Sequence, residues 1–155
     1  MPEIDVLDRV RQLDNATLEP VVRGILGDDS ASPMPGWVAK PIGGGFGPGT
    51  LGIFHVSGTA SIASGVSVAS GGSGTSEWSV VAKVMDLDAT SQMFAHSSPA
   101  REIKAYESGL LNSIGSAIPV KPSLRGAQHF GVNEIAGLGT ILWVEDLSAA
   151  IQAPW

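Results

Sequence analysis

Residues 42–56 read Ile-Gly-Gly-Gly-Phe-Gly-Pro-Gly-Thr-Leu-Gly-Ile-Phe-His-Val, and this glycine-rich stretch is where the chain becomes informative. Six of the fifteen residues are glycine, which loses more backbone freedom on folding than any other residue. One physical reason for such a cluster is a loop whose backbone N–H groups approach an anion such as phosphate. Residues with strand propensity precede and follow the glycines. The pattern therefore predicts a strand over about 36–42, a glycine loop, and a strand over about 52–58; an ordinary glycine-rich hairpin is the alternative.

Residues 78–85, Trp-Ser-Val-Val-Ala-Lys-Val-Met, are the clearest strand in the chain. Because side chains alternate along a strand, one face carries Trp78, Val80, Ala82 and Val84, and the other Ser79, Val81, Lys83 and Met85. Lys83 is therefore an ammonium in the middle of an apolar strand, where a lysine seldom lies without a partner. The alternative interpretation is a lysine on an edge strand, which prevents aggregation.

Two helices are predicted before the first strand. Residues 4–13 favour a short helix, and a second helix follows, with Thr17 as its N-cap and Gly27 as its stop signal. The spacing i, i+3, i+4, i+7 gives the second helix one apolar face, made of Leu18, Val21, Val22 and Ile25. Residues 28–35 are polar and contain prolines, so they predict a loop.

A third helix begins at Ser98 and Pro99, a cap followed by proline at the first helical position. Its apolar stripe is Ile103, Tyr106, Leu110 and Leu111. Glu102 and Glu107 flank that stripe on opposite sides, and the helical pattern alone allows either of them to reach inward.

Four further segments complete the prediction. Residues 59–77 are rich in glycine and serine and predict a connection with a mobile tip. Residues 119–125 carry two prolines and predict a short edge strand, and residues 128–138 predict a turn. Residues 140–147 form a near-continuous apolar run with two acids near its end, which indicates a buried strand.

The composition limits the classes of function. The 155 residues suggest one domain, and 43% apolar residues suffice for a core. A net charge of −6 disfavours a broad surface for nucleic acid or for an anionic membrane. No cysteine is present, no apolar run is long enough to span a bilayer, and the first residues lack the features of a signal peptide. The expected location is the cytoplasm.

Taken in order, these motifs resemble the nucleotide-binding lobe of the protein-kinase-like fold. More specifically, they are similar to the aminoglycoside phosphotransferase and choline-kinase group, including its ecdysteroid-kinase-like branch. The matching segments are residues 43–47 with 53–56, 80–83, 101–106, 118–122 and 142–148. The resemblance implies an α+β fold, with a five-stranded, mainly antiparallel sheet, one packed helix and an N-terminal helical extension.

The resemblance also implies roles for particular residues. The glycine loop would cover the phosphates of ATP, with Gly44, Gly45, Phe46, Gly47 and Gly49 as its candidate residues. Lys83 would contact the α- and β-phosphates, and Glu102 rather than Glu107 would orient it, because the family motif is Arg-Glu-x-x-x-Tyr.

The same resemblance implies a place for the adenine. Val81, together with Phe54 or Val56, would cover the base, and the backbone of Glu145 and Leu147 would hydrogen-bond its edge. Independently of the family, a lysine on an inward face costs several kcal/mol when unpaired, so a partner such as Glu102 is expected on physical grounds.

The part of the family that performs the chemistry has no match here. No histidine is followed by the aspartate of a His-x-Asp catalytic loop, so the base and the aspartate that holds Mg²⁺ are expected beyond Trp155. The expected organisation is a helical extension and loop over 1–35, a nucleotide-binding lobe over 36–148, and the start of a missing C-terminal lobe over 149–155. ATP with Mg²⁺ and a small-molecule hydroxyl acceptor are the implied partners, and the chain alone is expected to transfer no phosphate.

Two interpretations from other classes stay open. The spacing Gly47-x-Gly49-x-x-Gly52 matches a dinucleotide-binding motif, but that motif needs a helix after the glycines, and here a strand-like run follows. The second is a non-catalytic β-rich binding or scaffold module in which Lys83 and Glu102 form only a structural ion pair.

Overall fold

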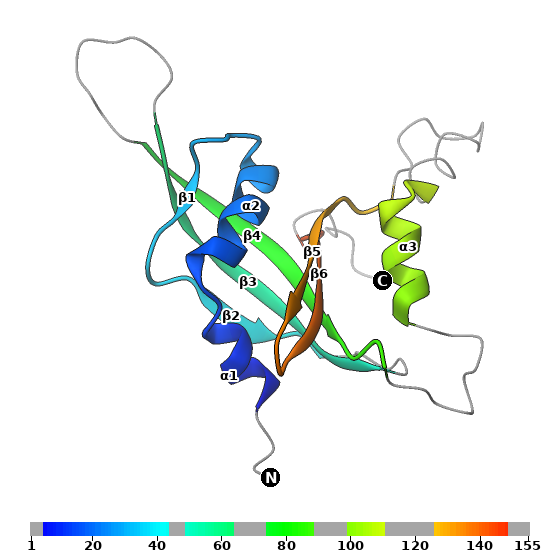
Figure 1. Cartoon of the computed structure of the whole chain (residues 1–155). Helices are drawn as coiled ribbons and strands as arrows, with labels where there is room; N and C mark the ends of the chain where they lie inside the picture. The colour runs from blue at the N-terminus through cyan, green and yellow to red at the C-terminus, as the bar shows by residue number, and fades with distance from the viewer. Residues whose placement is uncertain (1–4, 44–48, 64–73, 89–98, 111–125, 149–155) are drawn as a thin grey trace, which may run out of the picture.

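The computed structural model shows an α+β fold built on a curled antiparallel sheet with few helices (Figure 1). It describes residues 5–43, 49–63, 74–88, 99–110 and 126–148. The helices are α1 (Val6–Arg11), α2 (Asn15–Leu26) and α3 (Pro99–Glu107). The strands are β1 (Ser32–Pro33), β2 (Val38–Pro41), β3 (Thr50–Ile62), β4 (Gly74–Met85), β5 (His129–Ile135) and β6 (Gly139–Glu145). No helix in the described part of the chain is long and apolar enough to cross a membrane.

The six described strands form one sheet in the order β1-β3-β4-β6-β5, with β2 paired to β3. The long β3–β4 hairpin is its centre, and the pairing runs from Thr50 opposite Met85 to Ile62 opposite Gly74. β6 pairs with β4 from Met85 back to Val80, where Glu145 lies opposite. Residues 74–79 of β4 therefore extend beyond the end of β6.

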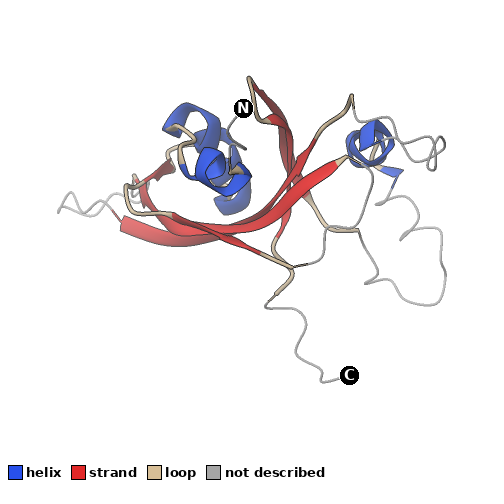
Figure 2. Ribbon diagram, turned by 90° about the horizontal axis from the view of Figure 1, so that it is seen from below, coloured by secondary structure: helices blue, strands red, loops and turns tan. Residues whose placement is uncertain are grey.

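One face of this sheet carries the main core. The alternation predicted for β4 is observed, because Trp78, Val80, Ala82 and Val84 are all buried on the same face. α1 and α2 lie against this face, inside the curve of the sheet (Figure 2), with Val10, Leu18, Val21 and Val22 buried against it.

Local signals explain where α2 begins and ends. The Asp14 carboxylate accepts hydrogen bonds from the Thr17 backbone N–H at 2.9 Å and from the Thr17 hydroxyl at 2.7 Å. Asp14 is therefore the N-cap, and the prediction of Thr17 at this position is wrong, because Thr17 lies inside the first turn. Gly27 ends the helix in the left-handed conformation, with a φ of 63°, as its position predicted.

α3 lies on the other side of the β5–β6 hairpin from α1 and α2 (Figures 1 and 2). Its Ile103 packs with Met85 and Leu142 in a second, smaller cluster, which Tyr106, Val132 and Val144 border. α3 therefore covers the face of the sheet that carries Lys83, while α1 and α2 cover the opposite face.

Several predicted elements differ from the observed ones. Residues 128–138 do not form only a turn: His129–Ile135 is β5, and the turn is confined to the residues between β5 and β6. The predicted loop over 28–35 contains β1, and with β5 it is one of two strands of the six-stranded sheet that were not predicted. The two ends of the Gly/Ser-rich segment 59–77, residues 59–62 and 74–77, are paired as strand, because small side chains fit a sheet whose hydrogen bonds come from the backbone. The mobile tip predicted for this segment lies outside the described residues. The strand predicted over 119–125 lies outside the described residues.

Candidate functional site

The predicted lysine and the predicted glutamate are in contact. Lys83 Nζ lies 2.5 Å from Glu102 Oε2. Ile103, only 7% exposed, anchors α3 on the sheet, and this docking brings the neighbouring Glu102 over Lys83. An ammonium has three donors, and the structure describes one hydrogen bond from it, to Glu102.

The energy of this ion pair is modest. Its side chains are 22% and 37% exposed, so solvent screens the attraction, and the pair contributes about 1 kcal/mol or less to stability. We therefore expect the fold to tolerate the loss of this contact.

The glycine loop begins and ends at the same end of the sheet as Lys83. The hairpin is closed by a 2.9 Å hydrogen bond from the Ile42 N–H to the Ile53 carbonyl, and Ile53 lies opposite Lys83. Gly49 has a φ of 80°, which favours glycine, and its carbonyl accepts from the Asp86 N–H at 2.7 Å. Gly44, Gly45, Phe46 and Gly47 lie outside the described residues.

The prediction that Phe54 or Val56 covers the same space as Val81 is wrong. Phe54 and Val56 are 5% and 0% exposed and belong to the main core on the opposite face. The residue of β3 opposite Val81 is His55, as the register shows. The prediction chose residues on the wrong face of β3. Side chains alternate between the faces of a strand, so a shift of one residue moves the predicted position to the opposite face.

A hydrogen-bond network around Asp146 lies on the Lys83 face, and the sequence patterns did not predict it. His55 Nε2 lies 2.9 Å from Asp146 Oδ2, and the Ser79 hydroxyl donates to the same oxygen at 2.7 Å. The Ser148 N–H donates to Oδ1 at 3.0 Å. Strand alternation alone could have placed His55 on the face opposite to Phe54 and Val56. The contact with Asp146 could not be predicted in this way, because the two residues are ninety-one positions apart in the sequence.

The environment of Asp146 favours its ionised form. Burial of the carboxyl group raises its pKa, but the hydrogen bonds from Ser148, Ser79 and His55 together outweigh that effect. The result is a pKa well below the usual value for aspartate. The carboxylate is therefore a stable anchor for the three donors around neutral pH.

Glu145 and Leu147 are the two residues predicted to bind the adenine edge. Glu145 is the last residue of β6, and Leu147 lies two residues after it. The Glu145 N–H donates to the Gln128 carbonyl at 2.8 Å, and its carboxylate accepts from the Gln128 N–H at 3.0 Å. A contact from the Glu145 backbone to a base would therefore have to come from its carbonyl oxygen. The Leu147 side chain is 40% exposed.

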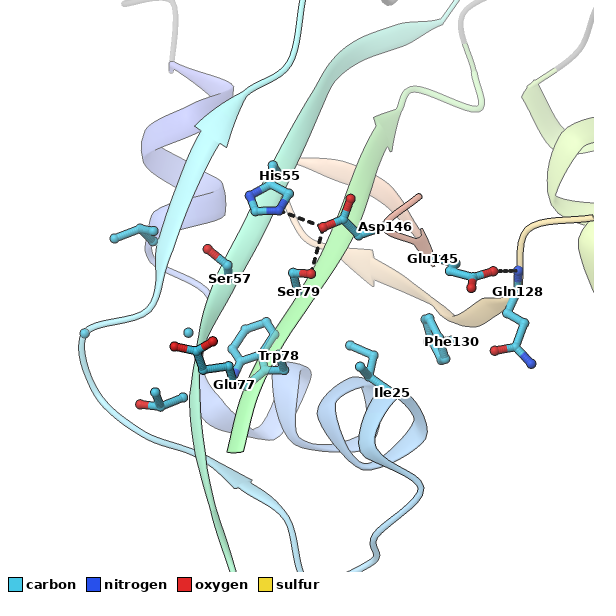
Figure 3. A pocket seen from close by; sticks show the side chains of 14 residues that line it. Ile25, His55, Ser57, Glu77, Trp78, Ser79, Gln128, Phe130, Glu145 and Asp146 are labelled. Atoms are coloured by element: carbon cyan, nitrogen blue, oxygen red, sulfur yellow. Dashed lines mark hydrogen bonds and ion pairs between the residues drawn. The ribbon is translucent and has the colours of Figure 1, made fainter. Parts of the chain in front are cut away.

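An open pocket of about 760 Å³ lies beside the part of β4 that extends beyond β6 (Figure 3). Its polar lining includes His55, Ser79 and Asp146, and its apolar lining includes Trp78, Ile25 and Phe130. Lys83 and Glu102 do not line it. Ser79, which lines the pocket, is four residues before Lys83 on the same strand face, about 13 Å along β4.

No protein-family model, curated protein or solved structure matches this chain. Within the described ranges, no three histidine, aspartate or glutamate side chains come together in a way that could hold a metal ion.

Proposed function

We propose that this chain is the ATP-binding lobe of a small-molecule kinase with the protein-kinase-like fold, of the aminoglycoside phosphotransferase and choline-kinase group. The complete activity would transfer the γ-phosphoryl group of ATP to a hydroxyl of a small molecule, in the cytoplasm. The observation that carries the proposal is the contact between Lys83 and Glu102 at the glycine-loop end of the sheet.

The contact supports nucleotide binding for three reasons. The carboxylate holds the ammonium in place, and the remaining donors of Lys83 suit phosphate oxygens. The residues on either side of the undescribed segment 44–48, Ile42 and Gly49, are hydrogen-bonded to the strands at this end of the sheet, and glycines between them would allow the backbone to approach an anion. The pair adds little to stability, so a purely structural role explains it less well.

The roles proposed for the residues follow from these positions. Lys83 binds the α- and β-phosphates, Glu102 orients Lys83, and the glycine loop covers the phosphates. Val81, two residues from Lys83 on the same face, lies at the level of the base. For the described residues, the proposal is limited to binding and orienting the nucleotide.

A second candidate is a non-catalytic binding or scaffold module in which Lys83 and Glu102 form a structural pair. One observation favours it: the open pocket lies away from Lys83, beside the extension of β4. A ligand of such a module would depend on the pocket residues and not on Lys83.

The test is a titration of the full chain with Mg·ATP and ADP, followed by thermal melting and tryptophan fluorescence. We expect nucleotide to raise the melting temperature, Lys83→Ala to abolish the response, and Glu102→Gln to weaken binding about tenfold, the effect of losing one charged hydrogen bond. Lys104→Ala is the control, because it removes an exposed lysine from the same helix. An equal response from wild type and Lys83→Ala would contradict the proposal and favour the second candidate.

A further inference from the structure

One edge of β4 stays open beyond the end of β6. β6 pairs with β4 only as far as Val80, which lies opposite Glu145. The Glu145 N–H donates to the Gln128 carbonyl, away from β4, so Val80 and Glu145 form a pair without mutual hydrogen bonds. Because backbone groups alternate in direction along a strand, Thr75 and Glu77 turn their N–H and C=O groups toward the open edge. Within the described part of the chain, no strand pairs with them on that side.

The pocket of about 760 Å³ lies along this edge and has an apolar side and a polar side (Figure 3). Trp78 belongs to the main core, and the partly buried Ile25 and Phe130 pack against that core. Glu77 and Ser79 turn to the opposite face, because side chains alternate along the strand. A strand added at this edge would therefore place its side chains alternately in apolar and in polar surroundings.

The polar side of the pocket is acidic. Glu77, Glu145 and Asp146 line it, and the lining residues, all from the described ranges, include no lysine or arginine. A second copy of this chain would bring its own exposed Glu77 to the same edge, and like charges on neighbouring strands destabilise their pairing. The net charge of −6 also opposes association of two copies. The charges therefore favour a basic partner over a second copy of the chain.

We propose that the open edge of β4 binds an extended segment of a partner protein in which basic and apolar residues alternate. The segment would add a strand to the sheet, with backbone hydrogen bonds to Thr75 and Glu77. Its basic side chains would lie on the face of Glu77 and Asp146, and its apolar side chains would lie on the face of Trp78 and Phe130. This site is additional to the proposed nucleotide site, whose lysine does not line the pocket.

The experiment measures binding of a fluorescent peptide, Lys-Val-Lys-Val-Lys-Val-Lys, to the full chain by fluorescence anisotropy. One control peptide has the same composition with the lysines and valines in separate blocks. The other carries N-methyl groups on the lysine backbone nitrogens, which are the donors that would face β4 when the lysines lie opposite Glu77. We expect the alternating peptide to bind about tenfold more tightly than either control, because each control loses either the alternation or the backbone bonds.

Two matched pairs of variants test the site on the chain. Thr75→Pro removes an N–H from the open edge and keeps the hydrogen bonds to β3, so it should weaken binding about tenfold, whereas Thr75→Val should retain the affinity. Glu77→Lys should also weaken binding about tenfold, whereas Glu134→Lys, the same change of charge at an exposed position of β5, should change it little. Melting temperatures of all four variants check that they fold.

The outcomes separate this inference from the proposed function. If the alternating peptide does not bind, or binds equally to wild type and Thr75→Pro, or binds no more tightly than the N-methylated peptide, the inference is overturned. If wild type forms a dimer that Thr75→Pro dissociates, a second copy occupies the edge and the proposed partner is wrong. Lys83→Ala should leave peptide binding unchanged, and a loss there would also overturn the inference. A chain that binds the peptide in this way but no nucleotide would overturn the proposed function alone.

Discussion

The two faces of the β3–β4 hairpin differ sharply, although the same two strands form both. On the face covered by α1 and α2, Phe54, Val56, Val80 and Ala82 are apolar and buried. On the other face, the neighbouring positions carry His55, Ser79 and Lys83, which are paired with acids from α3 or from the end of β6.

Because side chains alternate between the two faces of a strand, the same strand can contribute to the core on one face and carry polar groups on the other. The apolar face provides the hydrophobic burial that holds the sheet to its helices. The polar face adds ion pairs and hydrogen bonds that are partly exposed and contribute little energy each. Substitution of a side chain on this face should therefore lower the stability of the fold only modestly, which suits a binding surface.

The largest expected effect is on the apolar face. Trp143 is fully buried, and its Nε1 donates to Asn133 Oδ1 at 2.7 Å. We expect Trp143→Ala to lower the free energy of unfolding by about 3–5 kcal/mol, because it leaves a large cavity and an unpaired amide. Urea unfolding would measure this loss, with Val38→Ala as an exposed control.

The same measurement on Lys83→Ala tests the polar face. Its effect on the free energy of unfolding should stay near 1 kcal/mol or below. A loss as large as that of Trp143→Ala would show that the polar face also holds the fold together, and the contrast between the faces would be wrong.

The next effect concerns the junction of β4 and β6, which both faces share. Gly139 has a φ of 121°, and a Cβ atom added there would lie 2.5 Å from the Met85 carbonyl oxygen. We expect Gly139→Ala to destabilise the chain by about 1–3 kcal/mol, because the backbone has to move away from a strained conformation. Gly43→Ala, which meets open space, should change the melting temperature little. Equal melting temperatures for the two variants would contradict this.

The last expected effect is a pH dependence from the polar face. Because the pKa of Asp146 is lower in the folded state than its usual value, its contribution to stability is present above that value and is lost as the pH falls toward the folded pKa. We expect Asp146→Asn to lower the free energy of unfolding by about 1–2 kcal/mol at pH 7, and the difference from wild type to shrink between about pH 5 and pH 2. Chemical unfolding over this pH range would measure it, and a difference independent of pH would contradict the assignment.

Much of the local structure could be predicted from the sequence. Regular spacing of apolar residues indicated α2 and the stripe that carries Ile103, and alternation indicated which residues of β4 are buried. The two missed strands lacked that signal. β1 has only two residues. β5 reads His-Phe-Gly-Val-Asn-Glu-Ile and has no buried side chain, so its pairing with β6 determines its conformation.

The same distinction holds for the candidate site: some of its features could be predicted from local sequence patterns, and others could not. Short-range periodicity was enough to predict that Lys83 needs a partner on an apolar strand and that a helix carrying Glu102 follows it. The pairing of His55 with Val81 on one face, and the contacts of Asp146 with His55 and Ser79, emerged from the folded chain alone. Strand register and long-range contacts depend on how distant segments pack together, and no local pattern encodes that packing.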